Sequence, residues 1–197
     1  MKNKFDKRIY DIKALNEDIR KFIVHSDAFV ETMSNPIISK TFSESISLAV
    51  TQVNGCKLCS YTHTKNALKA GMTQEEVESL LSGGFDNAPK EQLEALLFAQ
   101  HYAETKGNPD PETKQKLLEI YGEEKTKDII SYILIIMFAN LHGNTMEAFR
   151  RRFKGKRVEG SSLWQEIAVI IHFFKIMPII LFKKVRYKLF ATKTARF

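Results

Sequence analysis

Apolar residues recur at three- and four-residue steps along much of the chain, which places them on one face of an α-helix. The pattern is clearest at Phe42, Ile46, Ala49, Val50 and Val53. The two-residue alternation typical of a half-buried β-strand is absent from the sequence. We therefore predict an all-α fold.

Glycine, proline and capping residues divide the chain into the predicted helices. Gly55 and Gly71 mark helix ends, because glycine tolerates the left-handed conformation found there. Thr73 and Glu76 match a capping box, and Pro111 suits the first position of a helix. The helices we expect cover residues 6–22, continuing with a break to 33, then 36–54, 56–70, 73–81, 87–104 and a further helix from 111.

Residues 128–141 are apolar on nearly every side but too few to span a bilayer. They should form the central buried helix. A helix that is apolar all round must be covered all round, so we expect a second subunit to supply part of the cover. The sequence thus predicts a homo-oligomer.

Charge separates the last quarter of the chain from the rest. Residues 150–197 hold 13 Lys and Arg but only 2 acidic residues, whereas residues 1–149 hold 17 basic and 21 acidic residues. The net charge of +7 therefore comes from a basic C-terminal segment and is not a sign of nucleic-acid binding by the main body. We predict a helical domain at residues 1–158 and a C-terminal helical extension at residues 159–197.

The extension contains an apolar run at residues 167–182, which Pro178 interrupts. The run is shorter than the roughly 20 residues of a membrane-spanning helix, and the proline should kink it, so we expect no span. One interpretation is a helix pair packed on the core or on a neighbouring subunit. The second, favoured over nucleic-acid binding by the same basic residues, is peripheral membrane attachment, in which these residues meet anionic lipid. In that case the residues dipping into the interface would be Trp164, Phe173, Phe174 and Phe182.

The N-terminus has basic residues but lacks the apolar run of a secretory signal. We expect a cytoplasmic protein, located at the membrane periphery if the second interpretation of the extension holds.

The candidate chemistry lies in a Cys-x-x-Cys pair. Cys56 and Cys59 are the 2 cysteines of the chain, and His63 follows Cys59 by one helical turn. On a helix all three side chains share one stripe. A disulfide between such close residues would close almost no loop and stabilise little, so we interpret the pair as reactive. The helix start favours the thiolate of Cys56, and His63 can accept a proton from Cys59.

Glu44 lies in an apolar stretch, which makes it the best candidate for a carboxylate that relays the proton. Two thiols and a base can reduce a peroxide through a sulfenic acid and then a disulfide, which an external dithiol reduces. Two other interpretations compete: cysteines that only pack in the core, and a zinc site. The remaining histidines offer no paired spacing for a fourth zinc ligand, so we expect no metal.

Glu44, Cys56, Cys59 and His63 also carry a family resemblance. A Glu, eleven residues, Cys-x-x-Cys, three residues and a His resemble the carboxymuconolactone decarboxylase-like family, in particular its alkylhydroperoxidase D-like branch. The likeness is close over residues 41–83. It implies an all-helical bundle that assembles as a dimer, trimer or hexamer. It also implies a cofactor-free activity, either as a peroxiredoxin-type antioxidant peroxidase or as a disulfide oxidoreductase.

Carried over residue by residue, the resemblance makes Cys59 the sulfur that attacks the hydroperoxide and Cys56 the resolving sulfur. His63 and Glu44 would relay the proton, and a lipoyl-type or similar dithiol would be the reductant. The position of Cys56 at the helix start favours the opposite order, so both assignments stay open. Leu58 stands where some members have a His or Tyr, which removes one relay partner. The alternative function is a redox-sensing or membrane-associated interaction protein whose disulfide controls assembly.

Overall fold

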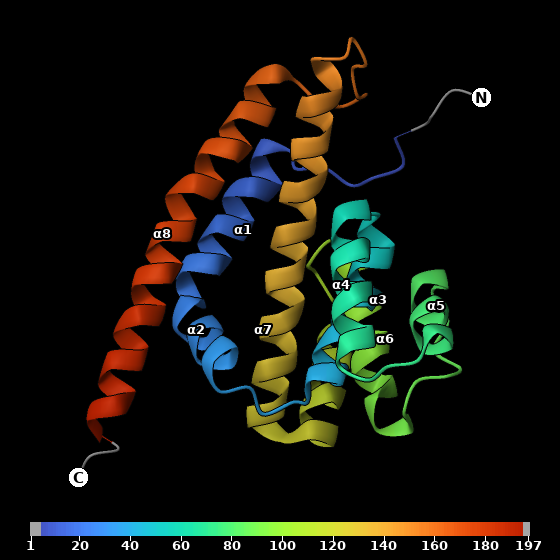
Figure 1. The fold of residues 1–197 in the computed structure, drawn as a ribbon, viewed down its shortest axis with the longest axis vertical. Coiled ribbons are helices and arrows are strands. Elements are labelled where there is room, and N and C mark those ends of the chain that lie inside the picture. Colours follow the sequence, from blue (N-terminus) through green and yellow to red (C-terminus); the bar gives the residue numbers. More distant parts are fainter. Residues whose placement is uncertain (1–4, 195–197) are drawn as a thin grey trace.

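The computed structural model describes the backbone of residues 5–194 and the side chains of residues 5–187 (Figure 1). The regular elements of this described part are helices, which confirms the all-α prediction. In chain order they are α1 (Ile12–Val24), α2 (Ser26–Ser34), α3 (Lys40–Asn54), α4 (Lys57–Lys69), α5 (Gln74–Ser82), the short 3₁₀ helix η1 (Lys90–Gln92), α6 (Leu93–Glu104), α7 (Pro111–Arg152) and α8 (Leu163–Thr194).

Helix α7 stands between two groups of helices, with α1, α2 and α8 on one side and α3 to α6 on the other (Figure 1). Gly122, with φ of 70°, separates its first turns from the rest. The predicted central helix at residues 128–141 lies in the second part, where Ile129 and Ile133 are fully buried. Its apolar positions contribute to three clusters: one shared with α3 and α6, one with α1, α2 and α8, and one in which Leu141 packs with Tyr10 and with residues of α1 and α8. Helices of the same chain therefore cover much of this helix, and the oligomer stays a prediction.

Helix α3 is the central element of the group that carries the cysteines, because it packs on α4, α5, α6 and α7. The predicted apolar face is inside: Ile46 and Val50 are fully buried, and Phe42 is nearly so. The helix begins at Lys40, four residues later than the sequence suggested, since the Ser39 hydroxyl accepts the Phe42 N–H at 3.1 Å. A serine cap thus sets this helix start.

The N-terminal helix also starts later than predicted. Residues 5–11 have no helical turn, and α1 begins after Asp11, whose carboxylate accepts the Ala14 N–H at 2.7 Å. The extended segment is held by α7 and by the end of α3, since the Tyr10 N–H donates to Thr145 and the Arg8 N–H to the Asn54 carbonyl. Tertiary contacts therefore keep this segment out of the helix.

Residues Leu163–Thr194 of the predicted extension form one helix, which continues through Pro178, where the sequence predicted a kink. Helix α8 packs on α2 and α7 through a buried face that includes Val169, Ile176 and Ile180. Contacts on both sides of Pro178 keep the two halves in line. Residues 163–187 are therefore long and apolar enough to cross a membrane by length and composition, so the exclusion based on length was wrong. Helix α7 meets the same criterion, but 61% of its apolar window is buried, compared with 22% for α8.

Candidate active site

The cysteines lie where α3 turns into α4. Gly55 ends α3 in the left-handed conformation, with φ of 70°. Cys56 then caps α4, and its Sγ accepts the backbone N–H of Cys59 at 3.3 Å. Cys56 is thus one position before the first turn in which the sequence placed it. The two cysteines are joined in a disulfide, so this is the oxidised form of the pair.

The two sulfurs differ in their access to solvent. Cys56 is 1% exposed, whereas Cys59 is only partly buried. Leu58 and Tyr61, on the open side of α4, are 71% and 69% exposed. A dissolved molecule therefore reaches Cys59 more readily than Cys56.

Helix α7 closes the other side of the disulfide at Gly143. A Cβ atom placed on this glycine would lie 3.1 Å from Cys56 Sγ and 3.6 Å from Cys59 Sγ. Sequence reasoning missed this residue. The available signal was a glycine inside a long helical pattern, which often marks close packing.

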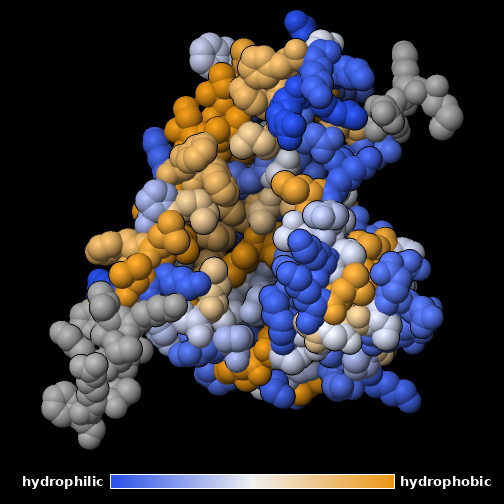
Figure 2. Space-filling view, in the orientation of Figure 1, coloured by the Kyte–Doolittle hydropathy of each residue, from blue (hydrophilic) through white to orange (hydrophobic). Residues whose placement is uncertain are grey.

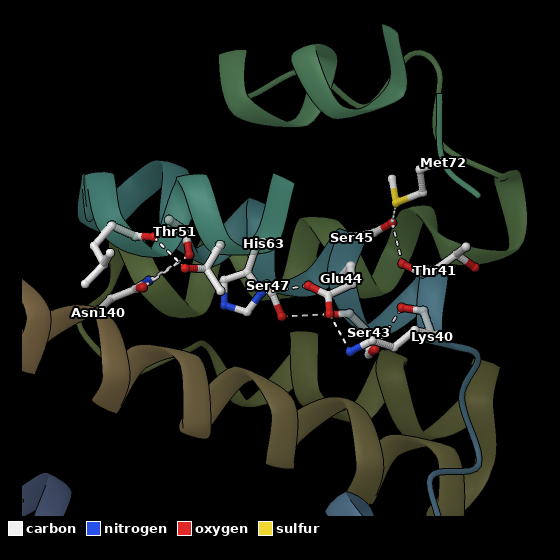
Figure 3. Close-up of polar contacts among 12 residues, drawn as sticks. Lys40, Thr41, Ser43, Glu44, Ser45, Ser47, Thr51, His63, Met72 and Asn140 are labelled. Atoms are coloured by element: carbon white, nitrogen blue, oxygen red, sulfur yellow. Dashed lines mark hydrogen bonds and ion pairs between the residues drawn. The ribbon is translucent and has the colours of Figure 1, made fainter. Parts of the chain in front are cut away.

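Asn144, the next residue of α7, holds the turn that carries Cys56. Its Nδ2 donates to the carbonyl oxygens of Asn54 and Arg8, both at 2.8 Å. One turn earlier, Asn140 exchanges hydrogen bonds with Thr51 of α3 at 3.1 and 3.2 Å (Figure 3). Buried amides of α7 thus fix α3 and its C-terminal end relative to the disulfide.

Glu44 and His63 form the predicted pair. The Glu44 Oε2 and His63 Nδ1 atoms are 2.7 Å apart, and the two side chains point toward each other from α3 and α4 (Figure 3). The Glu44 side chain is 3% exposed and that of His63 16%. The structure therefore brings all four predicted residues, Glu44, Cys56, Cys59 and His63, to the α3–α4 pair.

Lys40 is a further member of the site that sequence reasoning missed. Its Nζ lies 2.5 Å from Glu44 Oε1, so the two carboxylate oxygens have different partners. The spacing of four residues on one helix was the available signal. Burial raises the pKa of Glu44, but hydrogen bonds from His63 and Lys40 outweigh it and hold the pKa below its ordinary value. An ionised Glu44 accepts the Nδ1 proton of His63, which leaves Nε2 to accept a proton from a thiol.

The other histidines do not join this site. His142 is the neighbour of Gly143, but it is buried among Tyr10, Phe138 and Phe173. Among the side chains that the structure describes, no three His, Cys, Asp or Glu residues cluster as ligands for a metal ion.

Comparison with known proteins places the site within a family. The sequence profile of the carboxymuconolactone decarboxylase family matches residues 27–101, a range that includes Glu44, Cys56, Cys59 and His63. The chain belongs to the carboxymuconolactone decarboxylase family. Helices α7 and α8 lie beyond the part that the carboxymuconolactone decarboxylase profile covers. Membership and the paired cysteines together fit a role in redox chemistry.

A curated relative is the uncharacterized protein YdfG of Bacillus subtilis (strain 168). It is 32% identical over 99 residues, which make up 49% of this chain and 67% of the relative. No solved structure gives a significant match to the chain. Neither comparison assigns an activity to this member of the carboxymuconolactone decarboxylase family.

Proposed function

We propose that this protein is a thiol-dependent peroxidase of the alkylhydroperoxidase D-like type. It reduces hydroperoxides with Cys56 and Cys59 and receives electrons from an external dithiol such as a dihydrolipoyl group. One observation carries the proposal. Two bonded cysteines, of which Cys59 is the more accessible, lie at the start of α4, and the same helix carries a histidine that is hydrogen-bonded to a buried carboxylate.

The first step oxidises Cys59. His63 accepts the thiol proton at Nε2 while its Nδ1–H stays bonded to Glu44. The thiolate attacks one peroxide oxygen, an S–O bond forms and the O–O bond breaks. The leaving alkoxide takes the proton from the imidazolium and departs as an alcohol. The sulfur has then lost two electrons, and the peroxide has gained them.

The second step forms the disulfide. The Cys56 sulfur, which lies at the start of α4 where backbone N–H groups favour a thiolate, attacks the Cys59 sulfur. The S–O bond breaks, and the leaving hydroxide takes up the proton that the Cys56 thiol released and becomes water. The external dithiol then attacks the disulfide, passes through a mixed disulfide, and leaves as its own disulfide. Both cysteines return as thiols, which completes the cycle.

Peroxide consumption with a dihydrolipoyl reductant tests the proposal. Wild type should turn over, and Cys59→Ser, Cys56→Ser and His63→Ala should each lose turnover. Ser60→Ala, on the same helix, is the matched control and should keep it. In Cys56→Ser, a sulfenic-acid trap should label Cys59. If the trap instead labels Cys56 in Cys59→Ser and does not label Cys59 in Cys56→Ser, the roles of the two sulfurs are reversed. Absence of turnover in wild type would refute the peroxidase.

A redox-responsive interaction protein is the second candidate, and the apolar outward face of α8 is the observation that favours it. Such a protein would consume about one peroxide molecule per protein molecule as its disulfide forms. It would show no sustained turnover with any dithiol. Its association with a partner would change with the oxidation state. Turnover measured beside disulfide formation therefore separates the two functions.

A further inference from the structure

The outward face of α8 is apolar over most of the helix length. Six large apolar side chains on it are between 47% and 80% exposed: Trp164, Ile171, Phe174, Leu181, Phe182 and Val185. Figure 2 shows hydrophobic residues gathered along this side of the molecule. From Trp164 to Val185 the face is about 30 Å long. A largely apolar surface of this length, within whose span Lys175 is also exposed, marks a site that another molecule covers.

The inward face of α8 is already occupied. Val169, Ile176 and Ile180 are at most 6% exposed and pack among α1, α2 and α7. Phe173, which the sequence suggested for the outward face, instead lies 5.5 Å from the His142 ring. The outward face is thus a second apolar surface on the same helix, where a helix exposed to water would carry polar residues.

Positive charge flanks the apolar face at both ends. Before α8, the side chains of Lys154, Lys156 and Arg157 are exposed. Toward its C-terminal end come further basic residues, and residues 150–197 hold 13 Lys and Arg with 2 acidic residues. One of those acids, Glu166, is buried and bonded to Arg152 at 2.8 Å. The chain segment that carries the apolar face is therefore strongly basic.

We infer that the outward face of α8 binds the surface of an anionic phospholipid membrane. The helix lies in the plane of the interface, with its aromatic and aliphatic side chains among the upper parts of the acyl chains. The basic residues at both ends contact the phosphate headgroups. This inference concerns α8 alone and does not depend on the proposed function.

The charge pattern favours a membrane over a second copy of the chain. Because both ends of the apolar face are basic, two copies packed face to face would bring like charges together in either the parallel or the antiparallel orientation. Anionic headgroups instead neutralise these charges. Charge complementarity therefore selects lipid as the occupant.

The contacts of α8 also favour a helix that lies on the membrane over one that crosses it. A spanning helix would bring its inward face into the hydrocarbon. There, Glu166 is paired with Arg152, and Lys183 with Asp27 at 2.9 Å. Charged groups and the attached helices α1, α2 and α7 would have to enter with it, at a high cost in free energy. A helix lying on the surface keeps all these contacts.

The arrangement leaves the cysteines uncovered. Helix α8 lies on one side of α7 and α4 on the other (Figure 1). A membrane bound to α8 therefore does not cover the open side of α4, where Cys59 meets solvent.

Trp164 provides a direct readout, because it is the only tryptophan in the chain and is 80% exposed. The full-length protein is mixed with vesicles of phosphatidylglycerol and phosphatidylcholine, or of phosphatidylcholine alone. We expect its fluorescence to shift to shorter wavelength, and the protein to sediment with the vesicles, only when phosphatidylglycerol is present. High salt should reverse both effects.

Two variants separate the apolar and electrostatic contributions. Phe174→Gln/Leu181→Gln/Phe182→Gln should weaken vesicle binding on the order of 100-fold or more. Lys154→Gln/Lys156→Gln should weaken it on the order of 10-fold or more. Ile120→Gln changes a side chain of α7 that is 49% exposed, and should bind as wild type does.

Circular dichroism establishes whether each variant is folded. If the variant with three glutamines on α8 loses helix, vesicle binding by Lys154→Gln/Lys156→Gln alone tests the inference. Lack of binding to anionic vesicles, or equal binding to neutral ones, would overturn the inference. A concentration-dependent fluorescence shift without vesicles, with a dimer mass by light scattering, would overturn it in favour of a second copy.

Discussion

Gly143 of α7 packs directly against Cys56: a Cβ atom on the glycine would lie 3.1 Å from the Cys56 sulfur. The disulfide therefore touches the backbone of the central helix with no side chain between them. When the disulfide is reduced, the two sulfurs must move apart. They do so beside α7, which packs firmly against α3 and α4.

Replacing Gly143 by alanine tests this contact. Alanine stabilises a helix interior by roughly 0.5–1 kcal/mol relative to glycine. In the wild-type background the new methyl group crowds the Cys56 sulfur, so we expect Gly143→Ala to give no increase in the free energy of unfolding. In a Cys56→Ala background the same substitution should increase the free energy of unfolding. The coupling free energy between the two positions should be about 1 kcal/mol. Urea unfolding of the four proteins measures this coupling, and equal gains in both backgrounds would contradict the contact.

Lys40 should tune the proton relay through Glu44. Lys40→Met removes one of the two groups that hold the pKa of Glu44 low, so that pKa should rise. The acid limb of the pH profile of peroxide turnover should then move to higher pH. Because the Lys40 side chain is 64% exposed, we expect this limb to move by less than about one pH unit, with little change in rate at neutral pH.

Glu44→Gln should have a larger effect than the loss of Lys40, since it removes the charge that stabilises a protonated His63. General acid–base contributions suggest a loss of roughly 100-fold or more in turnover. Lys65→Met, on the exposed side of α4, is the control for both variants and should leave the profile unchanged. An equal effect of Glu44→Gln and Lys65→Met would argue against a relay.

His142 should make stability depend on pH. Burial lowers the pKa of His142 from 6.5 to about 4, while its bond to the Phe138 carbonyl acts in the opposite direction. The unfolded chain therefore takes up the proton more readily than the folded one. Above pH 6.5 the neutral His142 ring makes its full contribution to the free energy of unfolding. This contribution, up to about 3 kcal/mol, is lost as the pH falls toward 4.

His142→Phe should flatten this part of the stability profile, because phenylalanine fills the same aromatic site without titrating. Urea unfolding between pH 7 and pH 4 measures the difference. His25→Gln replaces an exposed histidine and should follow the wild-type curve. A wild-type slope in His142→Phe would assign the pH dependence to other groups.

Asn144 should be essential to the turn that carries Cys56. Asn144→Leu leaves the buried carbonyl of Asn54 and the part-buried carbonyl of Arg8 without this donor, which should lower the free energy of unfolding by roughly 2–4 kcal/mol. Asn108→Ala, in an exposed loop, should change stability by less than about 0.5 kcal/mol. Chemical denaturation of the two variants checks the difference, and similar values for both would refute it.

Features set by neighbouring residues were predictable from the sequence. The left-handed end of α3 at Gly55 and the capping box of Thr73 and Glu76 occur as expected, since both depend on a few adjacent residues. Cys59 and His63 lie on one helix as predicted, whereas Cys56 precedes that helix as its N-cap. Glu44 was identified from its apolar surroundings, and the structure buries it.

Features set by distant contacts were not predictable. Gly143 reaches the cysteines only because α7 packs against α4. The N-terminal segment stays extended because Thr145 and Asn54 bind its backbone. Helix α8 continues through Pro178 because its two halves rest on one packed surface, a condition that no local pattern around the proline reveals.

Helix α8 also shields the back of the helix that supports the cysteines. Phe138, next to His142 in space, is covered together with Phe22 and Phe29 by Ile176 and Ile180. A chain truncated before α8 would present this aromatic surface to water, on the face of α7 opposite Gly143. A shortened, minimal version of the protein would thus require new polar residues on α7 before its chemistry could be compared with that of the full chain.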